Sequence, residues 1–142
     1  MAKESFILTA DTAVRISSSV FTVILVLNIV AYKWFLYWRF HAFDMVMHTL
    51  GGLALGFFYL FLLLQKNESQ VIKFSKLIIF ISVLSFAVLG GVIWELTEYV
   101  LKSFTLFPAF FHKARFFGEI GLRNTMSDLF FDILGGSLAG LF

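Results

Sequence analysis

The chain has 142 residues, of which 60% are hydrophobic, 19% aromatic and only 14% charged. A soluble domain of this size carries about 25% charged residues, so the composition excludes most soluble classes and indicates an integral membrane protein. The sequence has no cysteine, which excludes disulfide scaffolds, thiolate metal sites and thiol catalysis. A net charge of +2 is too small to indicate binding to nucleic acid.

Four apolar runs are long enough to cross a membrane, which takes about 20 residues for a hydrocarbon core of about 30 Å. The predicted spans cover approximately residues 13–32, 43–64, 77–101 and 125–142. We therefore expect an all-α, polytopic membrane helix bundle with four transmembrane helices, forming a single integral membrane domain over residues 1–142. This predicts a multi-pass protein of the cell membrane, with the lipid bilayer as its first partner.

Successive spans alternate in direction, so the ends of the first and third spans and the starts of the second and fourth share one membrane face, which we call face B. The connectors on this face, residues 33–42 and 102–124, mix aromatic and basic residues. Such a mixture is typical of the headgroup interface, and we interpret most of it as an aromatic belt. Five basic residues there are candidates for contact with a phosphate or lipid headgroup: Arg39, Lys102, Lys113, Arg115 and Arg123.

The second and fourth predicted spans share a sequence pattern. Residues 44–56 and 128–140 both read D-x-x-x-[HD]-x-L-G-G-x-x-x-G, at a constant offset of 84 residues. This pattern predicts an internal repeat of two parallel helix hairpins, related by a pseudo-twofold axis along the membrane normal. Glycines four residues apart allow close backbone approach, so we expect four of them to serve in helix packing: Gly52, Gly56, Gly136 and Gly140.

Five of the nine acidic residues lie inside the predicted spans, together with one histidine. At helical spacing they form three pairs, each with both members on one helix face: Asp44 with His48, Glu95 with Glu98, and Asp128 with Asp132. At about 1.5 Å per residue, all six lie within about 10 Å of face B. Three predicted helices therefore bring these groups to the same level of the membrane.

A charge near the membrane centre costs about 2.5–3.5 kcal/mol, so the acids require bound cations, protons or salt bridges with basic residues at the rim. Carboxylates with one imidazole are a ligand set typical of Mn, Fe, Zn or Mg, and inward carboxylates at this spacing build di-metal sites in helix bundles. We therefore expect one or two divalent metal ions, with six candidate metal ligands: Asp44, His48, Glu95, Glu98, Asp128 and Asp132.

A purely structural interpretation is available for two of these candidates. Asp44 and Asp128 lie near the starts of predicted helices, where an anion meets the positive end of the helix dipole, and Asp128 follows Thr125 at the spacing of a capping box. Capping does not account for the other four candidates, which lie a turn deeper or near a helix C-terminus. The cluster as a whole therefore favours a functional site over a structural network.

Three motifs occur in order along the chain: Phe43-Asp44-x-x-x-His48, Trp94-Glu95-x-x-Glu98 and Asp128-x-x-x-Asp132, the first and last each followed by a glycine pair. Together they resemble the uncharacterised inner-membrane proteins typified by YjdF, over about the second to fourth spans. The last span is more distantly similar to the closing helix of VanZ-like proteins. The resemblance implies a polytopic membrane protein in which the acidic and histidine positions matter, and it implies no particular activity.

Three functions stay open on the sequence alone, and with them the question whether the protein is an enzyme. The first is a metal site near face B that acts on a lipid or lipid-linked phosphate, with metal-activated water and one glutamate as base. The second is a cation- or proton-coupled small transporter; the apolar half of the spans away from face B counts against it unless a homo-oligomer supplies a pore. The third is a structural membrane protein whose buried polar network fixes helix register.

Overall fold

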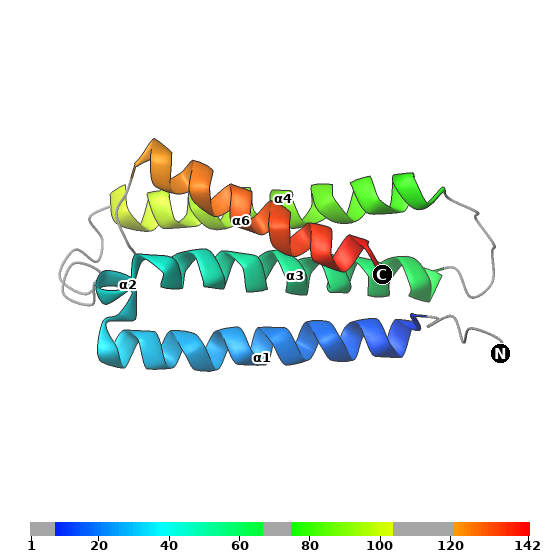
Figure 1. The fold of residues 1–142 in the computed structure, drawn as a ribbon, viewed down its shortest axis with the longest axis horizontal. Coiled ribbons are helices and arrows are strands. Elements are labelled where there is room, and N and C mark those ends of the chain that lie inside the picture. The colour runs from blue at the N-terminus through cyan, green and yellow to red at the C-terminus, as the bar shows by residue number, and fades with distance from the viewer. Residues whose placement is uncertain (1–7, 67–74, 104–120) are drawn as a thin grey trace.

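The computed structural model describes residues 8–66, 75–103 and 121–142, which are all-helical apart from short turns and ends. The helices in chain order are α1 (Ala10–Trp34), α2 (Leu36–Arg39), α3 (His41–Lys66), α4 (Lys76–Ser103) and α6 (Leu122–Gly140). The four long helices run along the longest axis of the molecule (Figure 1), α3 and α6 in one direction and α1 and α4 in the other. The all-helical fold class predicted from the sequence is therefore confirmed.

A sharp turn joins α1 to α3 at the face B end. α1 ends at Trp34, and its C-cap is Phe35, a residue with a φ of 56° whose N–H donates to the carbonyl of Ala31. The left-handed conformation costs a non-glycine residue about 1–2 kcal/mol, and it redirects the chain into the single turn of α2. The turn brings the Tyr37 hydroxyl back to α1, where it donates to Asn28 Oδ1 at 2.8 Å.

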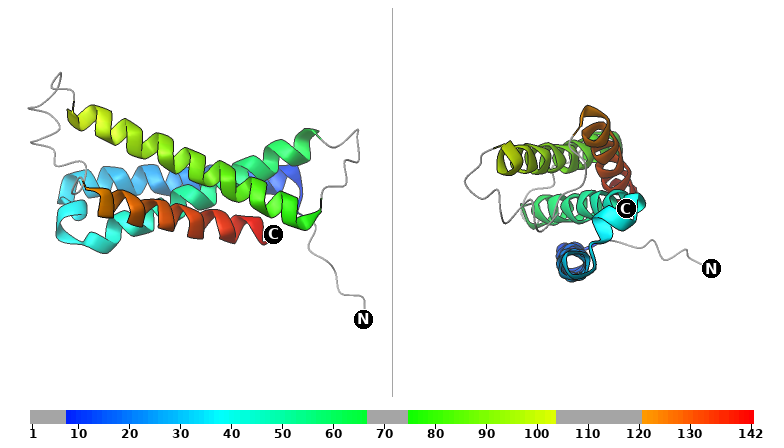
Figure 2. Two further views of the ribbon diagram at one scale, coloured as in Figure 1. Left: turned by 90° about the horizontal axis from the view of Figure 1, so that it is seen from above. Right: turned by 90° about the vertical axis from the view of Figure 1, so that its left-hand side faces the viewer.

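Helix α3 is the centre of the bundle. It packs against α1, α4 and α6, and α6 also packs against α4. Figure 2 shows α1 on one side of α3, with α4 and α6 on the other side. The buried Ser17 hydroxyl of α1 donates to the Ala54 carbonyl of α3 at 2.9 Å, which joins these two helices by a polar contact in an otherwise apolar interface.

Glycines bring the backbones of α3 and α6 into close contact. A Cβ atom added at Gly52 would collide with the main chain of Asp132, and one added at Gly135 would collide with the main chain of Thr49. At Gly56 an added Cβ would lie 2.5 Å from Ala139 Cβ. Small residues on both helices thus set the short distance between α3 and α6.

Three of the described helices are long and apolar enough to cross a membrane: Ala10–Trp34, Ala42–Gln65 and Lys76–Leu101. They correspond to the first three predicted spans, whose ends agree to within about three residues. Helix α6 is not among them; its 19 residues include Arg123, Asp128 and Asp132. The fourth span therefore stays a prediction.

The internal repeat also stays a prediction. Its two copies lie on α3 and α6, which run side by side in the same direction (Figure 1). His48 and Asp132, which are 84 residues apart and occupy equivalent positions of the shared pattern, are in contact. Both features are compatible with a parallel repeat, but neither demonstrates a duplication.

Candidate functional site

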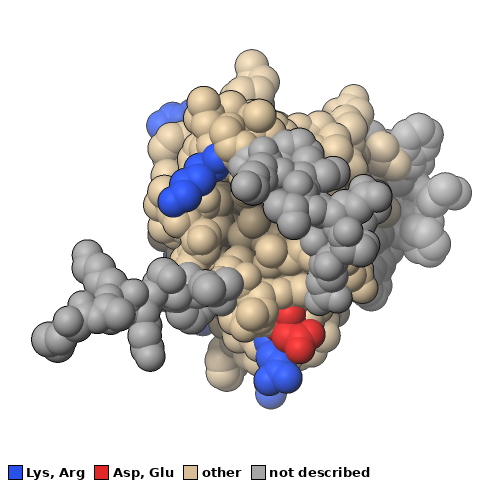
Figure 3. Space-filling view, turned by 90° about the vertical axis from the view of Figure 1, so that its right-hand side faces the viewer, with Lys and Arg blue, Asp and Glu red and all other residues tan. Residues whose placement is uncertain are grey.

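Acidic side chains surround one histidine toward the face B end of the bundle. The groups come from three helices: Asp44 and His48 from α3, Glu95 and Glu98 from α4, and Asp128 and Asp132 from α6. At the opposite end of the molecule, the described surface is mostly uncharged, with a few scattered charged residues (Figure 3). The acids of the cluster are thus concentrated near one end of the bundle.

His48 is the centre of this cluster and is only 7% exposed. Its Nδ1 atom lies 3.2 Å from Asp132 Oδ2. Its Nε2 atom lies 3.7 Å from Glu95 Oε1 and 3.8 Å from Asp44 Oδ1. The two ring nitrogens therefore face carboxylates from three different helices.

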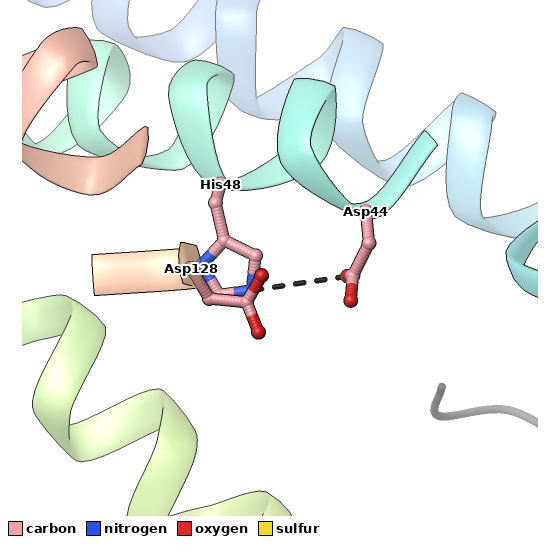
Figure 4. Close-up of side chains that lie close together, drawn as sticks. All are labelled: Asp44, His48 and Asp128. Carbon is pink, nitrogen blue, oxygen red and sulfur yellow. Dashed lines mark ion pairs between the residues drawn. The ribbon is translucent and has the colours of Figure 1, made fainter. Parts of the chain in front are cut away.

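Asp128 completes the group around the ring. It is 2% exposed, and Asp44, His48 and Asp128 each offer one ligand atom within 4.8 Å of the other two. Figure 4 shows the side chains of Asp44 and Asp128 close to the imidazole ring. A buried group of two carboxylates and one imidazole has the composition of a divalent metal site.

Two hydrogen bonds from the first turn of α6 hold the carboxylates in place. The Asn124 side-chain amide donates to Asp128 Oδ2 at 2.6 Å, and the Thr125 hydroxyl donates to Glu95 Oε2 at 2.7 Å. The i,i+4 spacing of Asn124 and Asp128 was a usable sequence signal for the first bond. The second bond joins α6 to α4 and has no local signal.

The predicted position at a helix start is confirmed for Asp44 and wrong for Asp128. Asp44 lies in the first turn of α3, where the helix dipole favours a carboxylate. The N-cap of α6, however, is Gly121, which makes no side-chain capping bond, so Asp128 lies beyond the first turn. The burial of Asp128 therefore has to be explained by its partners in the cluster.

The two glutamates of α4 have different surroundings. Glu95 Oε1 is a buried oxygen with no hydrogen-bond partner in the part of the chain that the structure describes. Glu98 accepts a hydrogen bond from the indole N–H of Trp94 at 2.9 Å. Glu95 therefore belongs to the group around His48, and Glu98 lies beside it.

The basic residues proposed from the sequence do not pair with the cluster where they can be described. Arg39 and Arg123 are exposed, and no described Lys or Arg side chain forms an ion pair with Asp44, Asp128 or Asp132. Lys113 and Arg115, with the side chain of Lys102, lie outside the described residues. Rim salt bridges from the described basic residues thus do not neutralise these acids.

Tyr37 provides a neutral donor beside the acids. Burial raises the pKa of its hydroxyl well above the ordinary value, and the negative charges of Asp44 and Glu98 raise it further. The hydroxyl is therefore protonated at physiological pH, and it remains a donor to Asn28.

The apolar helices and the buried polar cluster together define an integral membrane protein. Within that class, the chain belongs to the family described as predicted membrane protein DUF2238, whose family model matches residues 4–142. Comparison with curated proteins and with solved structures gives no match. The membership confirms a membrane protein family without an assigned function, while the likeness to YjdF and VanZ-like proteins stays a resemblance.

Proposed function

We propose that the cluster binds a divalent metal ion near face B, with Asp44, His48, Glu95 and Asp128 as its ligands. The observation that supports this proposal is the position of the His48 ring between opposing carboxylates. Nδ1 contacts the buried Asp132, while Nε2 faces Asp44 and Glu95.

An ionised carboxylate only accepts hydrogen bonds, so the contact with Asp132 requires a proton on Nδ1 of His48. In the neutral ring, Nε2 then carries a lone pair that points toward carboxylate oxygens, an arrangement that is repulsive unless a metal ion lies between them or Nε2 is protonated as well. A carboxylate–histidine–metal triad has this arrangement, with the carboxylate fixing the tautomer and raising the basicity of the ligand. We therefore assign Asp132 the role of positioning His48 instead of binding the ion.

The distances also favour a metal ion over direct hydrogen bonds. Two ligand atoms about 2.1 Å from one ion, at a tetrahedral angle, are about 3.4 Å apart. The separations of 3.7 and 3.8 Å from Nε2 are near this value and longer than a good N–H···O hydrogen bond. The buried oxygen of Glu95 that has no described hydrogen-bond partner would gain one by binding the ion.

The ligand types narrow the choice of metal. Imidazole suits Zn and Fe, whereas carboxylates also suit Mn and Mg. A mixed ligand set with a single histidine therefore favours Zn, Fe or Mn as the ion bound by His48 and the carboxylates. A second ion would arrive with a phosphate substrate, because Mg²⁺ is commonly held by one or two carboxylates together with substrate phosphates.

The chemistry we propose is hydrolysis of a lipid-linked phosphate ester. A bound ion would supply an activated water molecule, whose oxygen would form a bond to phosphorus while the P–O bond to the lipid alcohol breaks. Glu98, which lines the cavity beside the cluster, would accept the proton of the water and return it to the departing alcohol oxygen. The position of the cluster near face B supports a substrate that reaches the site from the headgroup region.

The first test is the metal content of protein purified in lipid nanodiscs and loaded with Zn²⁺ or Mn²⁺. We expect about one tightly bound ion per chain in the wild type and loss of this ion in His48→Ala and His48→Asn. Asp132→Asn should leave all proposed ligands in place but weaken metal affinity about 10- to 100-fold, because it weakens the hydrogen bond that orients the His48 ring. Asp11→Asn, an exposed acid on α1, is the matched control and should bind like the wild type.

An equal metal content in wild type and both His48 variants would contradict the metal site. Absence of metal from a stable wild-type protein would instead favour the structural network, with a protonated His48 between the carboxylates. A transport function predicts cation flux into proteoliposomes that depends on Glu95 and Asp132.

A further inference from the structure

A cavity of about 310 Å³ leads from the acid cluster into the apolar part of the bundle. It lies between α1, α3 and α4, and its volume is at the lower end of the range of about 300–1,000 Å³ that small-molecule sites occupy. Glu98, the proposed base, lines this cavity, but the rest of the cavity has no part in the proposed hydrolysis.

The polarity of the cavity changes along its length. Asp44 and Glu98 line it at the face B end. Phe21, Leu55 and Gly90 line the end that lies deeper in the bundle. His48 and, from α6, Asp132 also line it, with Asp132 beside Gly51 and Gly91. The polar part of the cavity thus extends to the level of Gly51, and the apolar part lies beyond it, which suits a molecule with a polar head and a hydrocarbon chain.

The cavity extends through about half of a hydrocarbon core. Asp44 and Leu55, which both line it, are about 16 Å apart along α3, and a hydrocarbon core is about 30 Å thick. The part that lies beyond the acid cluster, from His48 to Leu55, is about 10 Å long. This length takes the section of a hydrocarbon chain next to a headgroup at the cluster.

The cavity opens to the outside of the bundle between α1 and α4. Each of these helices packs against α3, whereas α1 and α4 are not among the packed helix pairs of the described chain. Figure 2 shows α4 crossing α3 and diverging from it toward face B. Phe21 and Trp94 line the cavity and are 43% and 47% exposed, so they mark its mouth. In a membrane, this mouth faces hydrocarbon chains.

We infer that the cavity binds the hydrocarbon chain of a single-chain lipid phosphate from the face B leaflet and places its phosphate at the acid and histidine cluster. The chain would enter sideways from the bilayer between α1 and α4. The phosphate headgroup in this inference rests on the proposed function, because the carboxylates would repel a phosphate unless the proposed metal ion were bound. The assignment of the chain to the cavity rests on its lining, length and mouth alone.

The test uses a lysophosphatidic acid with a diazirine in its acyl chain, added to the full-length protein in phosphatidylcholine vesicles containing Zn²⁺ and Mg²⁺. Photolabelled residues are located by mass spectrometry. We expect saturable labelling of residues that line the cavity, and at least a 10-fold decrease in Ile24→Trp, whose larger side chain fills the cavity from α1. Leu25→Trp, at a neighbouring position that is 62% exposed, is the matched control and should label like the wild type.

Equal labelling in wild type and Ile24→Trp would overturn the inference, as would labelling of the cavity by a diazirine phosphatidylcholine to the same extent. A monoacylglycerol with the same diazirine that labels equally well would overturn the phosphate headgroup. Metal content is measured on the same samples, and retention of metal by Ile24→Trp shows that its cluster is intact. If the protein holds no metal but is still labelled, and Ile24→Trp abolishes that labelling, the result would support the binding site for the chain and contradict the metal site. Ile24→Phe replaces Ile24→Trp if Ile24→Trp does not fold.

Discussion

Three of the four carboxylates around His48 have a hydrogen-bond partner. Asp132 contacts Nδ1, Asn124 donates to Asp128, and Thr125 donates to Glu95. The two donors sit in the first turn of α6, so the start of this helix orients acids on both α6 and α4. The geometry of the cluster therefore depends on residues that carry no charge themselves.

Replacing Thr125 with valine tests this dependence. Thr125→Val keeps the shape of the side chain and removes the hydroxyl that donates to Glu95 at 2.7 Å. A hydrogen bond to a charged group contributes about 1.5–3 kcal/mol, so we expect the free energy of unfolding in micelles to fall by about this amount. Metal affinity should fall as well, because Glu95 loses its orientation.

The matched control for Thr125→Val is Thr97→Val. The Thr97 hydroxyl is exposed and donates at 2.7 Å to the Ile93 carbonyl of its own helix, so its loss should change stability by less than about 0.5 kcal/mol. Equal stability and metal affinity in the two variants would show that the α6 contact does not shape the cluster.

At the scale of the elements, the contact between α3 and α6 brings His48 to Asp132. The contact is close because glycine occupies the positions where the two backbones approach. Neighbouring glycines of α3 differ in this respect. A Cβ at Gly52 would collide with the main chain of Asp132, whereas one at Gly51 would lie 3.9 Å from Asp132 Oδ1, an ordinary contact.

The variants Gly52→Ala and Gly51→Ala use this difference. Gly52→Ala should destabilise the protein by about 1–3 kcal/mol or more, because backbone atoms cannot move aside without separating the helices. Gly51→Ala should be neutral or slightly stabilising, since alanine favours a helix over glycine by up to about 1 kcal/mol. Unfolding in micelles measures both variants, and an equal loss of stability in both would contradict the packing explanation.

On the scale of the whole molecule, much of the fold follows from the apolar runs in the sequence. Run length predicts the three long apolar helices, and helical spacing with alternating direction places the acids at one level. Helix α6 is less apolar, because it carries Asp128 and Asp132 of the cluster together with Arg123, and its crossing of the membrane stays a prediction. Its direction, parallel to α3, is the one expected of a fourth span (Figure 1).

Contacts between helices were not predictable in the same way. The separate role of Asp132, the bond from Thr125 to Glu95 and the cavity all depend on how α3, α4 and α6 cross, which residue spacing within one helix does not determine. The spacing indicated which helix face carries each acid. It did not indicate which nitrogen of His48 each acid would face.

Because the natural chain has no cysteine, single cysteines can test the topology. If α6 crosses the membrane, Arg39→Cys and Arg123→Cys should react with an impermeant thiol reagent from the same side of sealed vesicles. Ser75→Cys and Leu141→Cys should react only from the other side. All four positions are exposed in the structure, which makes their reactivity a measure of sidedness. Reaction of Leu141→Cys from the same side as Arg123→Cys would show that α6 does not cross.

X-ray absorption at the zinc edge, on protein loaded with one equivalent of Zn²⁺, measures whether Nε2 of His48 binds a metal ion together with carboxylates from three helices. We expect oxygen and nitrogen ligands at about 2.0–2.2 Å, with an imidazole signal that disappears in His48→Ala. A spectrum without imidazole scattering, or one that is the same in wild type and His48→Ala, would show that His48 does not bind the ion.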